Sequence, residues 1–151
     1  MSVEDLPVAL AGVLTGINRL IRRRLRREMT GPPLRGAQVE LLRLVVAEPG
    51  VSVSAAAKEL YLAGNSVSTL VNQLTAAGLL RRETRRDDRR AVRLLPTPEA
   101  EARLRAWQER RAALVREHVE RLDEADRKAL AAALPALRRL AGNLQEEATT
   151  A

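Results

Sequence analysis

Two short blocks of arginine are the residues of this chain best suited to bind a ligand. Six arginines lie within residues 1–28 and seven within residues 79–97, which gives these segments net charges of +3 and +4. Residues 29–78 and 98–151 are each neutral, so the two blocks account for the whole net charge of +7. Guanidinium groups bind phosphates through paired hydrogen bonds, and clustered basic residues are typical of polyanion binding. The charge pattern therefore favours a phosphate-bearing partner.

A second candidate surface lies between the blocks, where residues 60–80 carry no charged side chain. Val67, Leu70, Val71 and Leu74 recur at helical spacing and predict an amphipathic helix over residues 65–77. The opposite face is polar and is formed by Asn65, Ser66, Ser68, Thr69, Asn72 and Gln73. Amides and hydroxyls can bind base edges and phosphates, so this face is a candidate for reading double-stranded DNA. The alternative is an ordinary solvated face, although the solvated stretch 99–121 is rich in Arg and Glu.

The remaining composition argues against catalysis and metal binding. The chain has no Cys and a single His, which excludes a thiol nucleophile and makes a metal centre improbable. It contains no Gly-rich phosphate loop and no arrangement typical of a catalytic triad. We therefore expect no enzyme activity, no metal and no cofactor. An acidic N-terminus and the lack of an 18-residue apolar run predict a cytoplasmic protein with no membrane partner. If it binds DNA, we expect it to be nucleoid-associated.

The elements around the polar face are predicted to be mainly helical. A long helix from Leu6 should end before Gly31, a second should span residues 35–47, and a third should begin at Ser52 as N-cap. Short segments at 79–83 and 91–95 predict a β-hairpin, with Leu79, Val92 and Leu94 facing the body. Tyr61, between two helices, is expected to be a packing residue.

Two further helices are predicted after the hairpin. Thr97-Pro98-Glu99 is typical of a helix start, and this helix should run to about residue 122. Asp123 should cap a last helix that Pro135 is expected to interrupt and kink. Apolar stripes on the first and last helices have nothing to cover within one chain, so we expect them to meet a second copy.

These elements predict a mainly α fold with a small β-hairpin wing. We expect one domain over residues 1–151. It consists of a winged helix-turn-helix at 34–97 flanked by dimerisation helices at 1–30 and 98–146.

Three motifs resemble the MarR family of transcriptional regulators: residues 50–60, residues 65–74 with Gly78-Leu-Leu-Arg-Arg-Glu83, and the wing Asp88-Arg-Arg90-Ala-Val-Arg-Leu94. The resemblance implies a homodimer with a recognition helix in the major groove and a wing in the minor groove. It makes Arg90 the minor-groove residue and Asp88 a residue that orients a neighbouring Arg. Arginines at a hairpin tip can also follow phosphates or enter a narrow minor groove. The candidate DNA-binding residues of the wing are therefore Arg85, Arg86, Asp88, Arg89 and Arg90.

Three positions depart from the family pattern. Ala63 and Gly64 stand where the family often has a Ser or Thr cap followed by Pro, so the recognition helix should start differently. Pro96 replaces an apolar strand residue and is expected to end the second wing strand early. The recognition helix lacks Arg and Lys, which favours base contacts by short polar groups over a bidentate Arg–guanine pair.

The sequence therefore predicts a homodimeric repressor of palindromic operators that a small-molecule effector releases. Two alternatives remain: a sequence-nonspecific architectural DNA-binding protein, and a helical protein-interaction module. The role of Arg19–Arg27 also stays open, between phosphate contact, inter-subunit ion pairing and a solvated helix flank. For His118 and Trp107 we expect packing roles.

Overall fold

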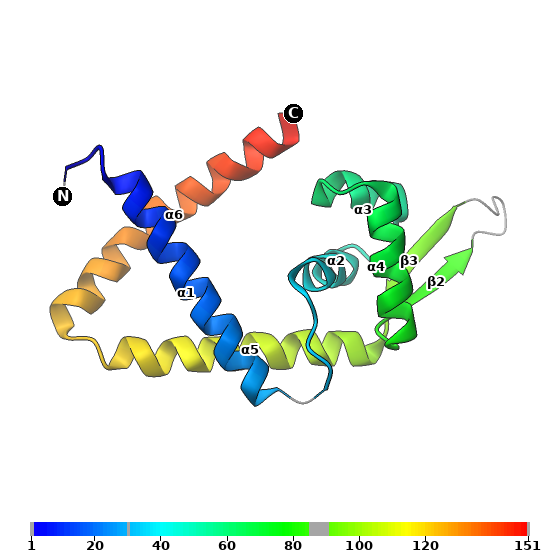
Figure 1. Cartoon of the computed structure of the whole chain (residues 1–151), viewed down its shortest axis with the longest axis horizontal. Coiled ribbons are helices and arrows are strands. Elements are labelled where there is room, and N and C mark those ends of the chain that lie inside the picture. Colours follow the sequence, from blue (N-terminus) through cyan, green and yellow to red (C-terminus); the bar gives the residue numbers. More distant parts are fainter. Residues whose placement is uncertain (1, 30, 85–90, 151) are drawn as a thin grey trace. The chain divides into compact units, whose positions relative to one another are not determined.

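The fold of the protein is given by a computed structural model that describes residues 2–29, 31–84 and 91–150. The chain divides into two compact units, with the boundary between Arg110 and Arg111. The first unit contains every strand and the first four helices (Figure 1). The elements are α1 (Leu6–Glu28), α2 (Gly36–Ala47), β1 (Val51–Ser52), α3 (Val53–Leu60), α4 (Gly64–Ala76), β2 (Leu80–Thr84), β3 (Val92–Pro96), α5 (Pro98–Glu120) and α6 (Glu124–Thr150).

The helix boundaries confirm the capping signals of the sequence. The Ser52 hydroxyl accepts a hydrogen bond from the Ala55 amide at 3.1 Å, which starts α3. The Asp123 carboxylate accepts from the Asp126 amide at 2.8 Å and starts α6. Both caps satisfy amides that lack a partner within their helix.

The sheet is larger than the predicted hairpin. Its strand order is β1-β3-β2, and both pairings are antiparallel. β1 pairs Val51 with Leu94 and was not predicted, because two residues beside the Ser52 cap are too short to show a period of two.

The expectation that Pro96 ends the wing strand early is wrong. Pro96 is the last residue of β3 and pairs with Leu80. The Thr97 amide then donates to the Leu79 carbonyl at 3.2 Å, so main-chain bonding continues beyond the residue that lacks an N–H.

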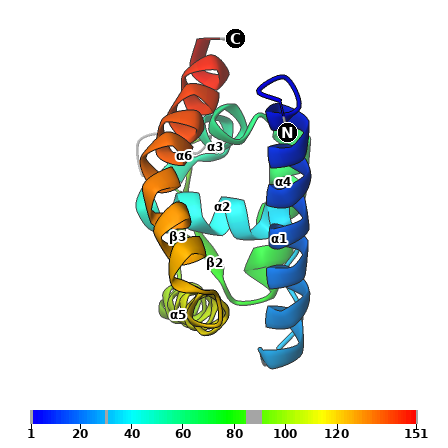
Figure 2. The same ribbon diagram turned by 90° about the vertical axis from the view of Figure 1, so that its left-hand side faces the viewer.

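The core of the first unit lies where α2, α3 and α4 pack on one another and on the strands (Figures 1 and 2). Leu79 and Leu94 are fully buried and Val92 packs against the same cluster, as the hairpin pattern predicts. Aliphatic side chains alone fill this cluster, in agreement with a chain that has no Phe. The wing strands are thereby fixed to the helices that precede them.

Two sequence expectations about the helices need correction. Tyr61 is 60% exposed and ends α3 in a left-handed conformation (φ 53°), so it is not a buried packing residue. Pro135 does not interrupt α6, which continues through it as one helix.

Across the described residues, no helix combines the length and apolarity needed to span a membrane.

Candidate nucleic-acid interface

Helix α4 has a buried apolar face and an exposed polar face. Val67, Val71 and Leu74 are fully buried, which fixes the helix on the core. All six polar residues predicted for the reading face are exposed: Asn65, Ser66, Ser68, Thr69, Asn72 and Gln73. The structure therefore places these side chains together on the outer surface of one rigid helix.

The two ends of α4 are built differently. Its N-cap Ala63 makes no side-chain cap bond, so the helix starts without the Ser or Thr cap that the resemblance would supply. At the other end Gly78 takes a φ of +74°, and the amides of Gly78 and Leu79 donate to the carbonyls of Thr75 and Leu74. This Schellman arrangement ends the helix and directs the chain into β2.

Two residues outside α4 hold the exposed side-chain amides of Asn72 and Gln73, and neither was predicted from the sequence. Gln38 of α2 donates from Nε2 to Gln73 Oε1 at 2.9 Å. Arg82 of β2 donates from Nη2 to Asn72 Oδ1. The partners are 35 and 10 residues apart in the sequence, so no local periodicity could have revealed them.

The predicted wing residues lie outside the described residues. Arg85, Arg86, Asp88, Arg89 and Arg90 fall in the segment between β2 and β3, whose last described pair is Thr84 with Val92. On the adjoining strands, the side chains of Arg81, Arg82 and Arg93 are exposed. The described part of the hairpin is thus basic on its solvent side.

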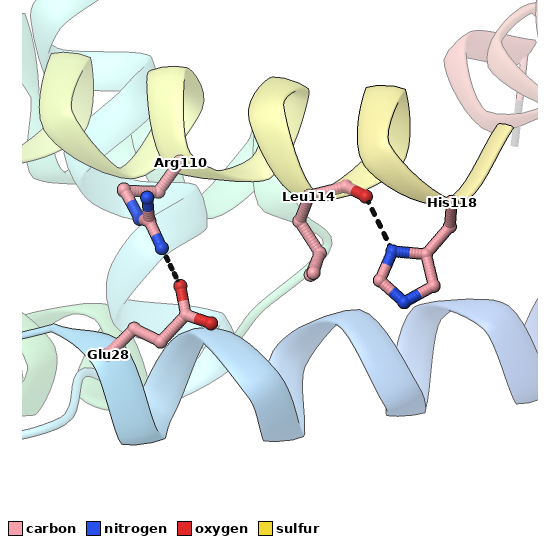
Figure 3. Close-up of polar contacts among 4 residues, drawn as sticks. All are labelled: Glu28, Arg110, Leu114 and His118. Carbon is pink, nitrogen blue, oxygen red and sulfur yellow. Dashed lines mark hydrogen bonds and ion pairs between the residues drawn. The ribbon is translucent and has the colours of Figure 1, made fainter. Parts of the chain in front are cut away.

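Interactions of α5 tie this surface to the rest of the first unit. Arg43 of α2 lies over the Trp107 ring, 4.9 Å from its centroid, which is a cation–π contact and supports the packing role expected for Trp107. Arg110 pairs with Glu28 of α1 (Figure 3). Arg103 donates to the Pro32 carbonyl. These contacts join α1, α2 and α5 within one unit.

Two further candidates, His118 and the Arg19–Arg27 block, lie on α5 and α1. His118 Nδ1 lies 2.9 Å from the Leu114 carbonyl one turn earlier, which satisfies the ring within its own helix (Figure 3). The arginines of the Arg19–Arg27 block are all exposed on α1. Within the described part of the chain, no group of three or more acidic, His or Cys side chains is arranged to hold a metal.

A three-helix core, an exposed fourth-helix face and a basic hairpin define a winged helix-turn-helix protein. Residues 33–91 match the family model of the MarR family, which confirms the resemblance seen in the sequence. This segment is similar to the MarR family, whose members are transcription regulators rather than enzymes.

Solved structures with the same fold extend over nearly the whole chain. RV1404 from Mycobacterium tuberculosis has a TM-score of 0.78 at 20% identity, covering 94% of this chain and 95% of its own. FabT from Streptococcus pneumoniae, solved in complex with DNA, has a TM-score of 0.72 at 20% identity, covering 95% and 99%. MepR, a transcription regulator of the Staphylococcus aureus multidrug efflux pump MepA, has a TM-score of 0.70 at 17% identity, covering 92% and 98%. A search of curated proteins found no match.

Proposed function

We propose that this protein is a homodimeric transcriptional repressor that binds palindromic operator DNA through α4 and the wing. The observation that carries the proposal is the outer face of α4, where six uncharged polar side chains are exposed on a helix anchored by buried aliphatic residues. Hydroxyl and amide groups on a rigid helix can bind base edges in the major groove. The exposed arginines of β2 and β3 add the phosphate attraction that duplex binding requires.

Exposed apolar side chains on α1 and α6 support dimer formation. Val13 and Ile17 on α1 are 57% and 50% exposed, and Leu144 on α6 is 63% exposed. Leu130 and Leu134 add to the stripe on α6. Contiguous apolar surface of this kind is rare on monomers and marks protein interfaces. In a two-fold symmetric dimer, each stripe would pack against the α1 stripe or the α6 stripe of the second chain.

A two-fold dimer explains how one short helix in each subunit can select a site. Two recognition helices about 34 Å apart enter successive major grooves on one side of the duplex, so the operator mirrors the protein's symmetry. A small molecule that favours another spacing would weaken DNA binding by the difference in its affinity for the two states. We include such an effector in the proposal, and the MepR regulator of a multidrug efflux pump is a relative in fold that motivates the search.

The test is selection of bound sequences from random duplexes with the full chain, followed by titration of the selected duplex and a scrambled one. The proposal expects an inverted repeat with half-sites one helical turn apart, and the selected duplex binds at least a thousandfold more tightly. Equal affinity for both duplexes would instead identify an architectural DNA-binding protein. The absence of salt-dependent duplex binding would identify a protein-interaction module. In cells, we expect the repressor to lie in the cytoplasm at the nucleoid. Deleting the repressor should then raise the expression of an adjacent gene.

A further inference from the structure

The side chain of Gln38 has an orientation that its partners fix. The Arg35 main-chain amide donates to Gln38 Oε1 at 2.8 Å, and a peptide N–H can only donate. Gln38 must therefore turn its oxygen toward Arg35, which leaves its NH₂ group to face α4. That group meets Gln73 at 2.9 Å, so it is the oxygen of Gln73 that lies against it.

Asn72 is oriented in the same way from the other flank. The guanidinium of Arg82 has donors and no acceptor, so the atom of Asn72 that it contacts is the oxygen Oδ1. Both Asn72 and Gln73 are exposed, whereas Gln38 is half-buried. Asn72 and Gln73 thus each have their side-chain oxygen bound by a donor of the protein and their NH₂ group available to a ligand.

An Asn or Gln amide whose oxygen faces the protein no longer presents both its acceptor and its donor to a base. A free Asn or Gln binds adenine through both groups, since adenine offers an acceptor at N7 and a donor at N6. With the oxygen turned toward its donor in the protein, the NH₂ group is the part of each amide that faces a ligand, and an NH₂ group requires acceptors. Guanine offers two adjacent acceptors at O6 and N7, and thymine offers O4. Adenine offers N7 alone, next to an amino group that an NH₂ donor cannot pair with, and cytosine presents only an amino group.

We propose that Gln38 and Arg82 are positioning residues that set base specificity by making Gln73 and Asn72 donor-only readers. The bases contacted by these two amides are then guanine, and next thymine, rather than adenine. This inference rests on the proposed function and specifies its chemistry. It assigns the specificity to one residue of α2 and one of β2, both outside the recognition helix.

The experiment compares base preferences of the wild-type protein and its variants by sequence selection from random duplexes. Gln73→Ala first identifies the position that Gln73 reads, because the preference there is lost. Gln38→Glu keeps the bond from the Arg35 amide, since a carboxylate at this third helical position also accepts it. The second carboxylate oxygen now accepts from Gln73, which turns the Gln73 oxygen outward.

The expected result for Gln38→Glu is a changed preference at that position alone, from guanine to cytosine or adenine, by about fivefold, the ratio that one hydrogen bond provides. Gln38→Met removes both polar contacts at similar volume and should admit adenine through the two-bond mode. Arg82→Met removes the donor that binds the Asn72 oxygen and should likewise admit adenine at the position that Asn72 reads. Gln108→Glu introduces the same charge on the exposed surface of α5 and should leave every preference unchanged.

The outcomes separate this inference from the function on which it rests. If the wild-type protein selects an inverted repeat but Gln38→Glu retains guanine at the Gln73 position, the inference is wrong and the function stands. Adenine at that position in the wild-type selection, or no change in Gln73→Ala, would also overturn it. A wild-type protein that enriches no motif contradicts the proposed function, and this inference with it. Far-ultraviolet circular dichroism of each variant verifies that α2 and α4 are folded.

Discussion

Thr97 is hydrogen-bonded to Gly78, which joins the end of the recognition helix to the start of α5. The Thr97 hydroxyl donates to the Gly78 carbonyl at 2.8 Å and accepts from the Ala100 amide at 3.2 Å. One hydroxyl thus caps α5 and closes the base of the wing hairpin. Since the wing leaves the body between these two residues, this contact fixes where the wing begins relative to α4.

The first prediction removes that hydroxyl. Thr97→Val keeps the branched shape but loses both hydrogen bonds, and we expect the free energy of unfolding to fall by about 1–2 kcal/mol. Urea denaturation at a fixed protein concentration measures the change. Thr97→Ser retains the hydroxyl and should stay within about 0.5 kcal/mol of the wild-type protein. Equal stability of the Val and Ser variants would show that the cap contributes nothing.

The second prediction concerns the backbone at Gly78. Its φ of +74° costs an L-residue about 1–2 kcal/mol, and a Cβ placed there meets nothing closer than Glu99 Oε2 at 3.7 Å. Gly78→Ala should therefore destabilise the protein through conformation alone, by that amount in thermal or urea unfolding. Gly64→Ala is the matched control, because its Cβ meets no atom within 4 Å and no left-handed φ is required. A Gly78→Ala variant as stable as Gly64→Ala would contradict the explanation.

The sequence predicted the elements well because their signals are local. Ser52, Gly78, Thr97 and Asp123 are caps whose chemistry acts within three or four residues, and each lies at a helix end in the structure. The reading face was predictable for the same reason, since helical periodicity separates it from Val67 and Val71.

The polar contacts that orient that face were not predictable. Gln38 reaches Gln73 only because α2 and α4 pack together, and nothing within either helix indicates the pairing. The strand β1 was missed because its two residues gain strand character from pairing with β3. Pro96 was misjudged because a strand end tolerates a residue without an N–H.

The third prediction concerns the dimer. Ile17→Asp on α1 and Leu144→Asp on α6 each place a charge within an exposed apolar stripe. If these stripes form the interface, burying that charge without a partner should prevent association. Light scattering at micromolar concentration should report monomers that retain helical circular dichroism but lose operator binding. Thr15→Asp adds the same charge at another exposed position of α1 and should leave the dimer intact. A wild-type protein that is monomeric under these conditions would contradict the proposed assembly.

The last prediction separates the roles of the wing and the recognition helix. Arg90, which lies outside the described residues, is expected in the minor groove, where Arg responds to groove width and negative potential. Arg90→Ala should weaken binding to operator and scrambled duplexes by similar factors. The slope of log K against log salt should also become shallower by about one unit for each lost contact in each subunit. Gln73→Ala should instead cost about 1–3 kcal/mol on the operator and little on the scrambled duplex.

Titration of both duplexes at several salt concentrations distinguishes the two roles. Arg138→Ala removes the same charge from an exposed position of α6, which is not part of the hairpin, and should leave the slope unchanged. If Arg90→Ala behaves like Arg138→Ala, Arg90 does not contact DNA and the wing assignment at this residue is wrong. If Gln73→Ala weakens both duplexes equally, Gln73 positions the helix on phosphates instead of reading a base. A specific loss for Gln73 together with a general loss for Arg90 is the result expected when α4 selects the sequence and the wing supplies sequence-independent attraction.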